Sequence, residues 1–188
     1  LADNQRALAS AKALGDLRLT ATHKTAQDAE TAYRNIFSRY LGMKLTEAQL
    51  RQDPGTIMKE TKINLEVLFT KDPSYSYGSY LFYTQFQETL QAIAAKAPPQ
   101  VDPVVIYSNI YLLPRAPNAA PNTDAIKTEL DNTWNALATA RNDYATAITQ
   151  SNLAIATAER DIAAAEDALR LAQKSLDDLK AGANPLAV

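Results

Sequence analysis

The clearest hydrophobic pattern lies in the last third of the chain, at residues 123–181. Apolar residues there recur in steps of three and four over about six heptads, and neither glycine nor proline interrupts them. One heptad position holds Trp134, Ile148, Ile155, Ile162, Leu169 and Leu176, with Arg141 as its polar exception; the other holds Leu137, Tyr144, Ser151, Ala158, Ala165, Ala172 and Leu179. This pattern predicts a long α-helix whose coiled-coil interface is formed by Trp134, Leu137, Tyr144, Ile148, Ile155, Ile162, Leu169, Leu176 and Leu179.

Both ends of this predicted helix carry the expected signals. Pro121 precedes Asn122 and Thr123, either of which can cap the first turn, and Gly182 followed by Pro185 ends the helix. A helix over residues 123–182 would be on the order of 90 Å long at a rise of about 1.5 Å per residue. Such a helix cannot bury its apolar stripe against itself, so the pattern predicts a partner helix.

Residues 1–42 are the expected partner. Apolar residues at helical spacing occupy Leu8, Ala11, Leu14, Ala29, Ala32, Tyr33, Ile36 and Tyr40, and Gly42 ends the segment. Its middle contains Gly15 and several threonines, which predicts a kink or a register shift there. Residues 1–45 carry seven Lys and Arg against four Asp and Glu, whereas residues 123–181 carry six against ten. Opposite net charges favour the two helices lying side by side, although each exposed pair contributes less than about 1 kcal/mol.

Residues 43–122 have a different composition. Twelve of the fourteen aromatic residues fall between Tyr33 and Tyr111, and eight of the nine prolines fall between Pro54 and Pro121. We expect short helices at residues 46–52, 55–69 and 79–96, and either a helix or a strand at residues 103–113, where Val, Ile and Tyr are frequent. The sequence therefore predicts an all-α protein: a long antiparallel two-helix coiled-coil hairpin with a small helical, aromatic-rich cap inserted between the two long helices.

In this interpretation residues 1–188 form one helical domain. The first long helix covers 1–42, the helical cap 43–122, the second long helix 123–182, and a truncated turn 183–188. The chain begins with Leu1 and shows no signal peptide, so we expect a piece of a longer protein. No apolar run reaches the roughly 20 residues of a membrane-spanning helix.

The amino-acid composition of the chain argues against some classes of protein function. The chain of 188 residues is 46% hydrophobic and 21% charged, has no cysteine, and carries a net charge of −2. These values are typical of a folded domain without disulfides or thiolate metal sites, and they argue against a dedicated nucleic-acid-binding protein, which needs a basic surface.

The sequence contains few residues that could form a catalytic or metal-binding site. The single histidine, His23, cannot form a zinc site without several converging carboxylates, and the doublets Glu166-Asp167 and Asp177-Asp178 are typical of a solvated helix surface. We therefore expect no catalytic, metal-binding or cofactor-binding residues and no enzyme activity. Tyr75 and Tyr77 precede a predicted helix in a tyrosine-rich segment, and tyrosines are frequent in recognition surfaces, so these two are candidates for partner contacts.

The run "AIATAERDIAAAEDALRLAQKSLDDLKAGANP" resembles the α-helical hairpin of bacterial membrane fusion proteins, also called periplasmic adaptor proteins or haemolysin-D-like proteins. In that family Ala/Leu heptad helices often close on a phrase like L-x-x-L-x-x-G-x-x-P, which corresponds here to Leu176, Leu179, Gly182 and Pro185. The match covers about the last sixty residues. Two features depart from the family: its Arg…Leu…Ser tip motif is not recognisable, and residues 43–122 replace a tight turn.

The resemblance implies a non-enzymatic spacer and docking domain of an export or efflux system. The parent protein would be anchored in the cytoplasmic membrane, with this domain in the periplasm or cell envelope. Its partners would be an inner-membrane transporter, an outer channel, or both, and the full-length protein would self-associate. An alternative hypothesis is an extracytoplasmic sensory or scaffold bundle with a small-molecule pocket in the aromatic cap.

Overall fold

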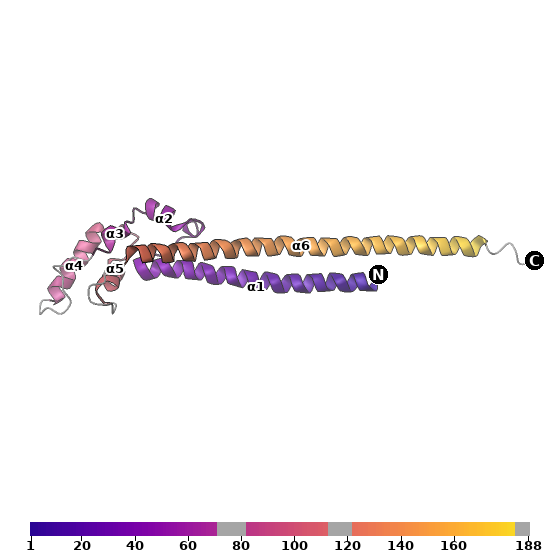
Figure 1. Ribbon diagram of the computed structural model, residues 1–188, viewed down its shortest axis with the longest axis horizontal. Coiled ribbons are helices and arrows are strands. Elements are labelled where there is room, and N and C mark those ends of the chain that lie inside the picture. The colour runs from indigo at the N-terminus through magenta and orange to yellow at the C-terminus, as the bar shows by residue number, and fades with distance from the viewer. Residues whose placement is uncertain (71–81, 113–121, 183–188) are drawn as a thin grey trace, which may run out of the picture. The chain divides into compact units, whose positions relative to one another are not determined.

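The computed structural model describes residues 1–70, 82–112 and 122–182, and its regular secondary structure in these residues is entirely helical. The elements are α1 (Ala2–Leu41), η1 (Gln49–Arg51), α2 (Pro54–Glu60), α3 (Leu65–Leu68), α4 (Phe82–Lys96), α5 (Pro103–Tyr107), η2 (Ser108–Leu112) and α6 (Thr123–Gly182). Figure 1 shows the long N-terminal helix α1 and the long C-terminal helix α6, which pack against each other. For the described residues, the prediction of an all-α protein is confirmed.

The chain divides into two compact units. The first contains Leu1–Thr25 and Arg141–Val188, and the second contains Ala26–Ala140. Both boundaries fall inside the long helices, because α1 and α6 each contribute residues to both units. The segments predicted from the sequence, 1–42 and 123–182, correspond to the two long helices themselves.

Helix α6 begins where the sequence predicts. The side-chain oxygen Oδ1 of Asn122 accepts hydrogen bonds from the backbone N–H groups of Asp124 at 3.0 Å and Ala125 at 3.3 Å. Asn122 thereby satisfies two of the amides that have no partner within the first turn of a helix, and Asp124 adds a negative charge near the positive end of the helix dipole. The cap explains why the helix starts directly after the proline-rich segment.

Helix α1 runs unbroken from Ala2 through Gly15 and ends at Leu41. Gly42 follows it with φ of +63°, and its N–H donates to the carbonyl oxygen of Ser38 at 2.9 Å. This left-handed conformation is the usual way to end an α-helix and favours glycine. A methyl group at Gly42 would also lie 2.4 Å from Cβ of Asp102, so close packing requires glycine here as well.

The side chain of Asn109 closes the same end of α1. Asn109 is 4% exposed, and its Nδ2 group donates to the carbonyl oxygens of Arg39 at 3.0 Å and Val105 at 2.9 Å. A buried amide is stable only when its polar atoms are hydrogen-bonded, and the last carbonyls of a helix need donors. Asn109 supplies such a donor from a segment 70 residues away in sequence.

One prediction for residues 43–122 needs correction, and one open alternative is decided. The single helix expected at residues 55–69 is two helices, α2 and α3, because Lys62 adopts a φ of 58° and Asn64 caps a new helix by accepting from the N–H of Val67 at 3.2 Å. Of the two alternatives for residues 103–113, the helix is confirmed for residues 103–112. Asp102 caps this segment by accepting from the N–H of Val104 at 2.8 Å, and Pro103 occupies the first helical turn, where proline is well tolerated.

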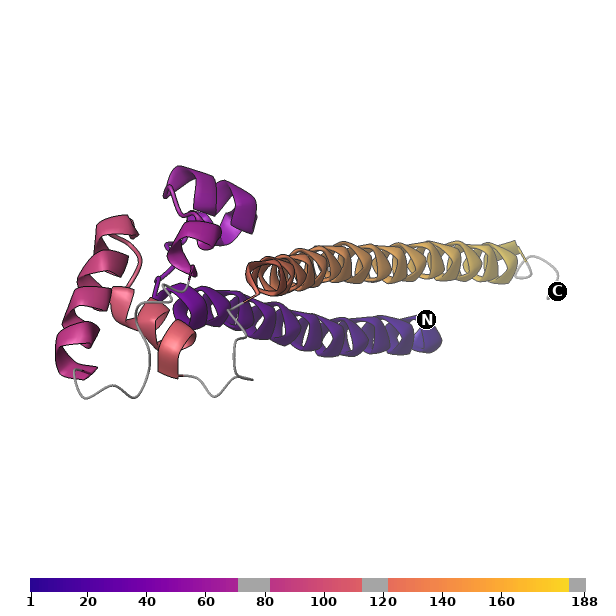
Figure 2. The ribbon, with the colours of Figure 1, turned by 60° about the vertical axis from the view of Figure 1, so that its left-hand side comes forward.

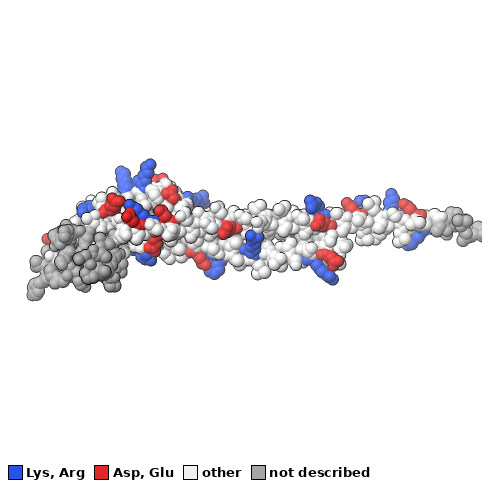
Figure 3. All heavy atoms as spheres, viewed as in Figure 1, with Lys and Arg blue, Asp and Glu red and all other residues white. Residues whose placement is uncertain are grey.

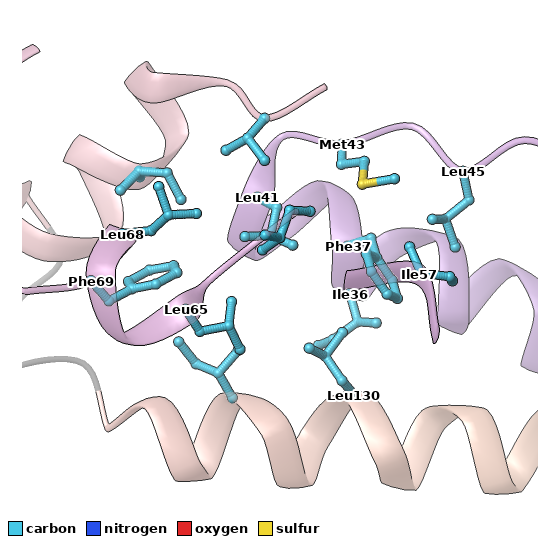
Figure 4. Packing of buried hydrophobic residues seen from close by; sticks show 14 of the residues in the cluster. Ile36, Phe37, Leu41, Met43, Leu45, Ile57, Leu65, Leu68, Phe69 and Leu130 are labelled. Atoms are coloured by element: carbon cyan, nitrogen blue, oxygen red, sulfur yellow. The ribbon is translucent and has the colours of Figure 1, made fainter. Parts of the chain in front are cut away.

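One hydrophobic cluster holds the second unit together. Figure 4 shows side chains from α1, from the segment after it, from α2 and α3, and from α6 meeting there. Phe37, Leu41 and Leu130 are fully buried within it, and the ring of Tyr33 packs edge-on against Phe37 with centroids 5.3 Å apart. Burying each such side chain contributes about 1.5–3 kcal/mol, so this cluster is the main source of stability in the unit.

Candidate interaction surface

The first unit consists of an antiparallel helix pair. Nδ2 of Asn4 donates to the carbonyl oxygen of Asp161 at 2.9 Å, and the rings of His23 and Tyr144 lie 5.1 Å apart. Residue numbers in α1 therefore rise as those in α6 fall. Figures 1 and 2 show the N-terminal part of α1 alongside α6 in both views. We call this line of contacts the seam.

The two helices approach most closely at Gly15 and Ser151. A Cβ atom added at Gly15 would lie 2.2 Å from Oγ and 3.3 Å from Cβ of Ser151. Both residues are buried, although each is surrounded by exposed positions on its own helix. Gly15 therefore permits close helix packing, and α1 continues through it as one helix.

The buried positions change their spacing at this point. On α1 the less exposed residues step by four from Ala11 to Gly15 and again to Leu19, and on α6 they step by four from Ala147 to Ser151 and again to Ile155. Two successive steps of four interrupt a heptad pattern and locally unwind a coiled coil. The interruption occurs in both helices at the contact between Gly15 and Ser151, so the less exposed positions of α1 continue to face those of α6.

This interruption changes which α6 residues face α1. Before Ser151 the buried residues are Ala140 and Ala147, whereas the heptad pattern placed Arg141 and Ile148 at the equivalent position. Ile148 is 38% exposed. The polar Arg141 therefore does not interrupt the seam, because the small Ala140 beside it takes the buried position.

The remaining predicted interface residues fall into two groups. Leu137 is fully buried, and Trp134, Tyr144, Ile155 and Ile162 are partly buried. Leu169, Leu176 and Leu179 are 47%, 51% and 71% exposed. The described part of α1 contacts α6 as far as Asp161, so an interface role for Leu169, Leu176 and Leu179 stays a prediction.

No protein-family model, curated protein or solved structure matches the chain. The function of the seam therefore has to be argued from its own residues.

Small side chains leave an open apolar groove beside the closest contact. It measures about 460 Å³ and is lined mainly by small residues of both helices, among them Ala7, Ala11 and Ala154. Leu14 borders the groove and is 66% exposed. Acidic and basic side chains are interspersed along the face of the long helices that Figure 3 shows. The surface therefore combines an apolar groove with charges of both signs, as is common where helices pack against other helices.

In the second unit, a polar cluster connects the end of α1 to the start of α6. Nη2 of Arg39 lies 2.7 Å from Oε1 of Glu129, and its guanidinium lies over the ring of Tyr40. The Tyr40 hydroxyl donates to Glu129 at 2.5 Å, and burial together with this hydrogen bond raises the Tyr40 pKa. Arg39 and Glu129 are 58% and 40% exposed, so the ion pair contributes less than about 1 kcal/mol. The three side chains satisfy one another's hydrogen-bonding groups and link the end of α1 to the start of α6.

The remaining candidates from the sequence are His23, Tyr75 and Tyr77. The ring of His23 lies beside that of Tyr144 in a tilted arrangement, and no group of three His, Asp or Glu side chains in residues 1–70, 82–112 and 122–182 could hold a metal ion. Tyr75 and Tyr77 lie outside the described residues. A search of the described helices for a segment with the length and apolarity of a membrane span finds none.

A small cavity in the second unit bears on the alternative hypothesis of a ligand pocket. It is lined by residues of α3, α4 and η2, including Leu68, Thr89 and Ile110, and its volume is about 30 Å³. A cavity of this size holds one or two water molecules. The predicted cap includes residues outside the described ranges, and the ligand pocket stays a prediction.

Proposed function

We propose that this chain is a non-enzymatic structural and assembly domain of a membrane fusion (periplasmic adaptor) protein, serving an export or efflux transporter as a spacer and docking surface. The observation that carries the proposal is the seam, in which α1 and α6 pack over many turns through small residues. A long helix pair of this kind provides length and contact surface.

The geometry of the first unit suits a spacer. Residues 141–182 of α6 extend for about 60 Å at 1.5 Å per residue, and neither proline nor an interior glycine interrupts them. Apart from Tyr144, their seam is built mainly from alanine, serine and isoleucine, and the small residues among these permit close packing against α1. The groove beside Gly15 offers a further surface on which another helix could pack.

The proposal also covers the hairpin formed by the two long helices and the cap at its end. The two long helices would form a hairpin, and residues 43–122 would form its aromatic-rich cap, where Tyr75 and Tyr77 would contact a partner. The parent protein would be anchored in the cytoplasmic membrane, and this domain would lie in the periplasm or cell envelope. Its partners would be the inner-membrane transporter, an outer channel, or both, without nucleic acid or cofactor.

The proposal is tested by the coding sequence on both sides of these residues and by an export assay. We expect half of a lipoyl-like module on each side and a transporter gene nearby. In cells that carry the parent gene, deletion of residues 2–182 should abolish export while the parent protein still reaches the membrane. Flanking segments of an enzyme, or export that survives the deletion, would contradict the proposal.

A further inference from the structure

The groove beside Gly15 and Ser151 is polar at one end and apolar at the other. It lies within the first unit and has a volume of about 460 Å³, which is typical of small-ligand sites. The polar end is lined by Arg18, Gln150 and Ser151, and the apolar end by Ala7, Ala11 and Ala154. We propose that this groove binds a small amphiphile that has a carboxylate head and an unbranched alkyl tail, such as decanoate.

The antiparallel direction of the two helices separates these ends. Gly15 lies against Ser151, and residue numbers in α6 fall as those in α1 rise. Arg18 therefore lies on one side of this contact, whereas Ala7 and Ala154 lie on the other. From Gly15 to Ala7 the helix rises by about 12 Å. An extended decanoate tail has a similar length, so its head and tail can reach their matching ends together.

Two side chains at the polar end lack a partner in residues 1–70, 82–112 and 122–182. Ser151 is 8% exposed, and its hydroxyl forms no hydrogen bond with the described residues. Arg18 carries a permanent positive charge, and its guanidinium forms neither a hydrogen bond nor an ion pair with them. Buried hydroxyl groups are normally hydrogen-bonded, and a guanidinium binds carboxylates through charge-assisted hydrogen bonds. One carboxylate at this end would therefore satisfy both groups.

The apolar end of the groove suits an alkyl tail. Ala7, Ala11 and Ala154 offer methyl groups, and the exposed side chain of Leu14 borders the groove. Ser10 is the polar exception, and its exposed position leaves its hydroxyl in contact with water. A tail in the groove removes apolar surface of both the ligand and the protein from water. A cation next to a buried hydroxyl at the other end favours an anionic head with an apolar tail over a purely apolar helix face.

This inference concerns the first unit itself and does not depend on the proposed function. The test is isothermal titration calorimetry of the full chain with decanoate below its micelle concentration. We expect one saturable site with a Kd of about 0.1–2 mM, the range for a ligand of this size. Acetate has the head alone and decyltrimethylammonium has the tail with the opposite charge, so both should bind at least roughly tenfold more weakly. No saturable binding of decanoate up to about 10 mM, or equal affinity for the cationic amphiphile, would overturn the proposal.

The position of the bound ligand is measured by amide chemical shifts in nuclear magnetic resonance spectra of the full chain. Decanoate should shift the amides of residues 7–18 and 150–154, which contain the groove lining. The amides of Phe37 and Leu130, in the hydrophobic cluster of the second unit, should stay unchanged and serve as the internal control. Shifts that are largest in the second unit would overturn the assignment of the site.

Two variants at the polar end test the head of the ligand. Arg18→Gln should weaken decanoate binding by roughly tenfold, because the carboxylate loses its charged partner, and should not weaken the binding of decyltrimethylammonium. Lys12→Gln is the control, since Lys12 is exposed and is not part of the groove lining. Ser151→Ala should weaken decanoate binding by roughly three- to tenfold. Decanoate affinity that falls equally in the Arg18 and Lys12 variants would contradict a specific carboxylate site.

A variant that fills the apolar end tests the tail of the ligand. Ala154→Leu should weaken decanoate binding by at least roughly tenfold, because the larger side chain occupies the space of the tail. Ala156→Leu is the matched control, since Ala156 is exposed on the same helix and is not part of the groove lining. Equal affinities of these two variants for decanoate, with helix content unchanged in both, would overturn the proposal.

Discussion

Replacing Gly15 with alanine gives the most specific prediction, because two effects oppose each other. Alanine is the better helix former, and an isolated helix would gain about 1 kcal/mol from this change. In the helix pair, the new methyl group lies 2.2 Å from Oγ and 3.3 Å from Cβ of Ser151. Rotation of the hydroxyl relieves the first contact and leaves the second, which is shorter than a normal contact between carbon atoms.

The clash should outweigh the gain in helix propensity. Inserting a methyl group into a well-packed contact costs about 1–3 kcal/mol. The net effect of Gly15→Ala is therefore a loss of roughly 1 kcal/mol, which lowers the melting temperature by about 2–4 °C in a protein of this size. Thermal unfolding followed by far-ultraviolet circular dichroism measures this shift.

Two further variants separate the steric cost of the new methyl group from the gain in helix propensity. Gly182→Ala adds a methyl group where nothing lies within 4 Å, so it should be neutral or slightly stabilising. The swap Gly15→Ala with Ser151→Gly restores the space, so the double variant should be more stable than the two separate effects predict, by about 1–2 kcal/mol. If Gly15→Ala stabilises the protein and shows no coupling to Ser151, the close contact is wrong.

Three further predictions concern the second unit. Burial raises the pKa of Tyr33 above its ordinary value, so stability should fall as the pH rises above about 10, and Tyr33→Phe should reduce this slope in chemical denaturation at several pH values. Asn109→Leu should lower the free energy of unfolding in urea by about 1–3 kcal/mol, because buried carbonyl groups lose their donor. The control is Asn35→Leu at an exposed position, which should change the free energy of unfolding by less than about 0.5 kcal/mol. Gly42→Ala should destabilise the protein by more than about 1 kcal/mol in thermal unfolding, since the φ of +63° and a 2.4 Å contact of the new methyl group with Asp102 both oppose a side chain. A melting temperature equal to that of the unmodified protein would contradict this prediction.

The long helices could be predicted because their signals are local. Heptad spacing, the Asn122 cap and Gly42 each act within a few residues, and these features account for the observed bounds of α1 and α6. The residue that faces the partner at each turn could not be predicted in the same way. Ile148 is the more apolar residue, yet Ala147 is buried, because the close approach at Gly15 shifts both helices out of the heptad phase.

The contacts within the second unit depend on long-range packing. No local pattern indicates that Asn109 would donate to the carbonyl of Arg39, or that Glu129 would pair with the same arginine. Lys62 breaks the helix expected at residues 55–69 by adopting a positive φ, which its residue type does not suggest. A glycine in an otherwise good helix was the one available signal for the Gly15 contact, since such a glycine often marks close packing.

Antiparallel pairing of α1 and α6 within one chain is the central claim, and one disulfide tests it most directly. His23→Cys combined with Tyr144→Cys joins two positions whose rings lie 5.1 Å apart, and the chain has no other cysteine. The control pairs His23→Cys with Ser151→Cys, about 10 Å further along α6. We predict that dilute, oxidised protein forms an intramolecular disulfide in the first variant and not in the control. Only intermolecular disulfides, or equal yields in the two variants, would contradict the account.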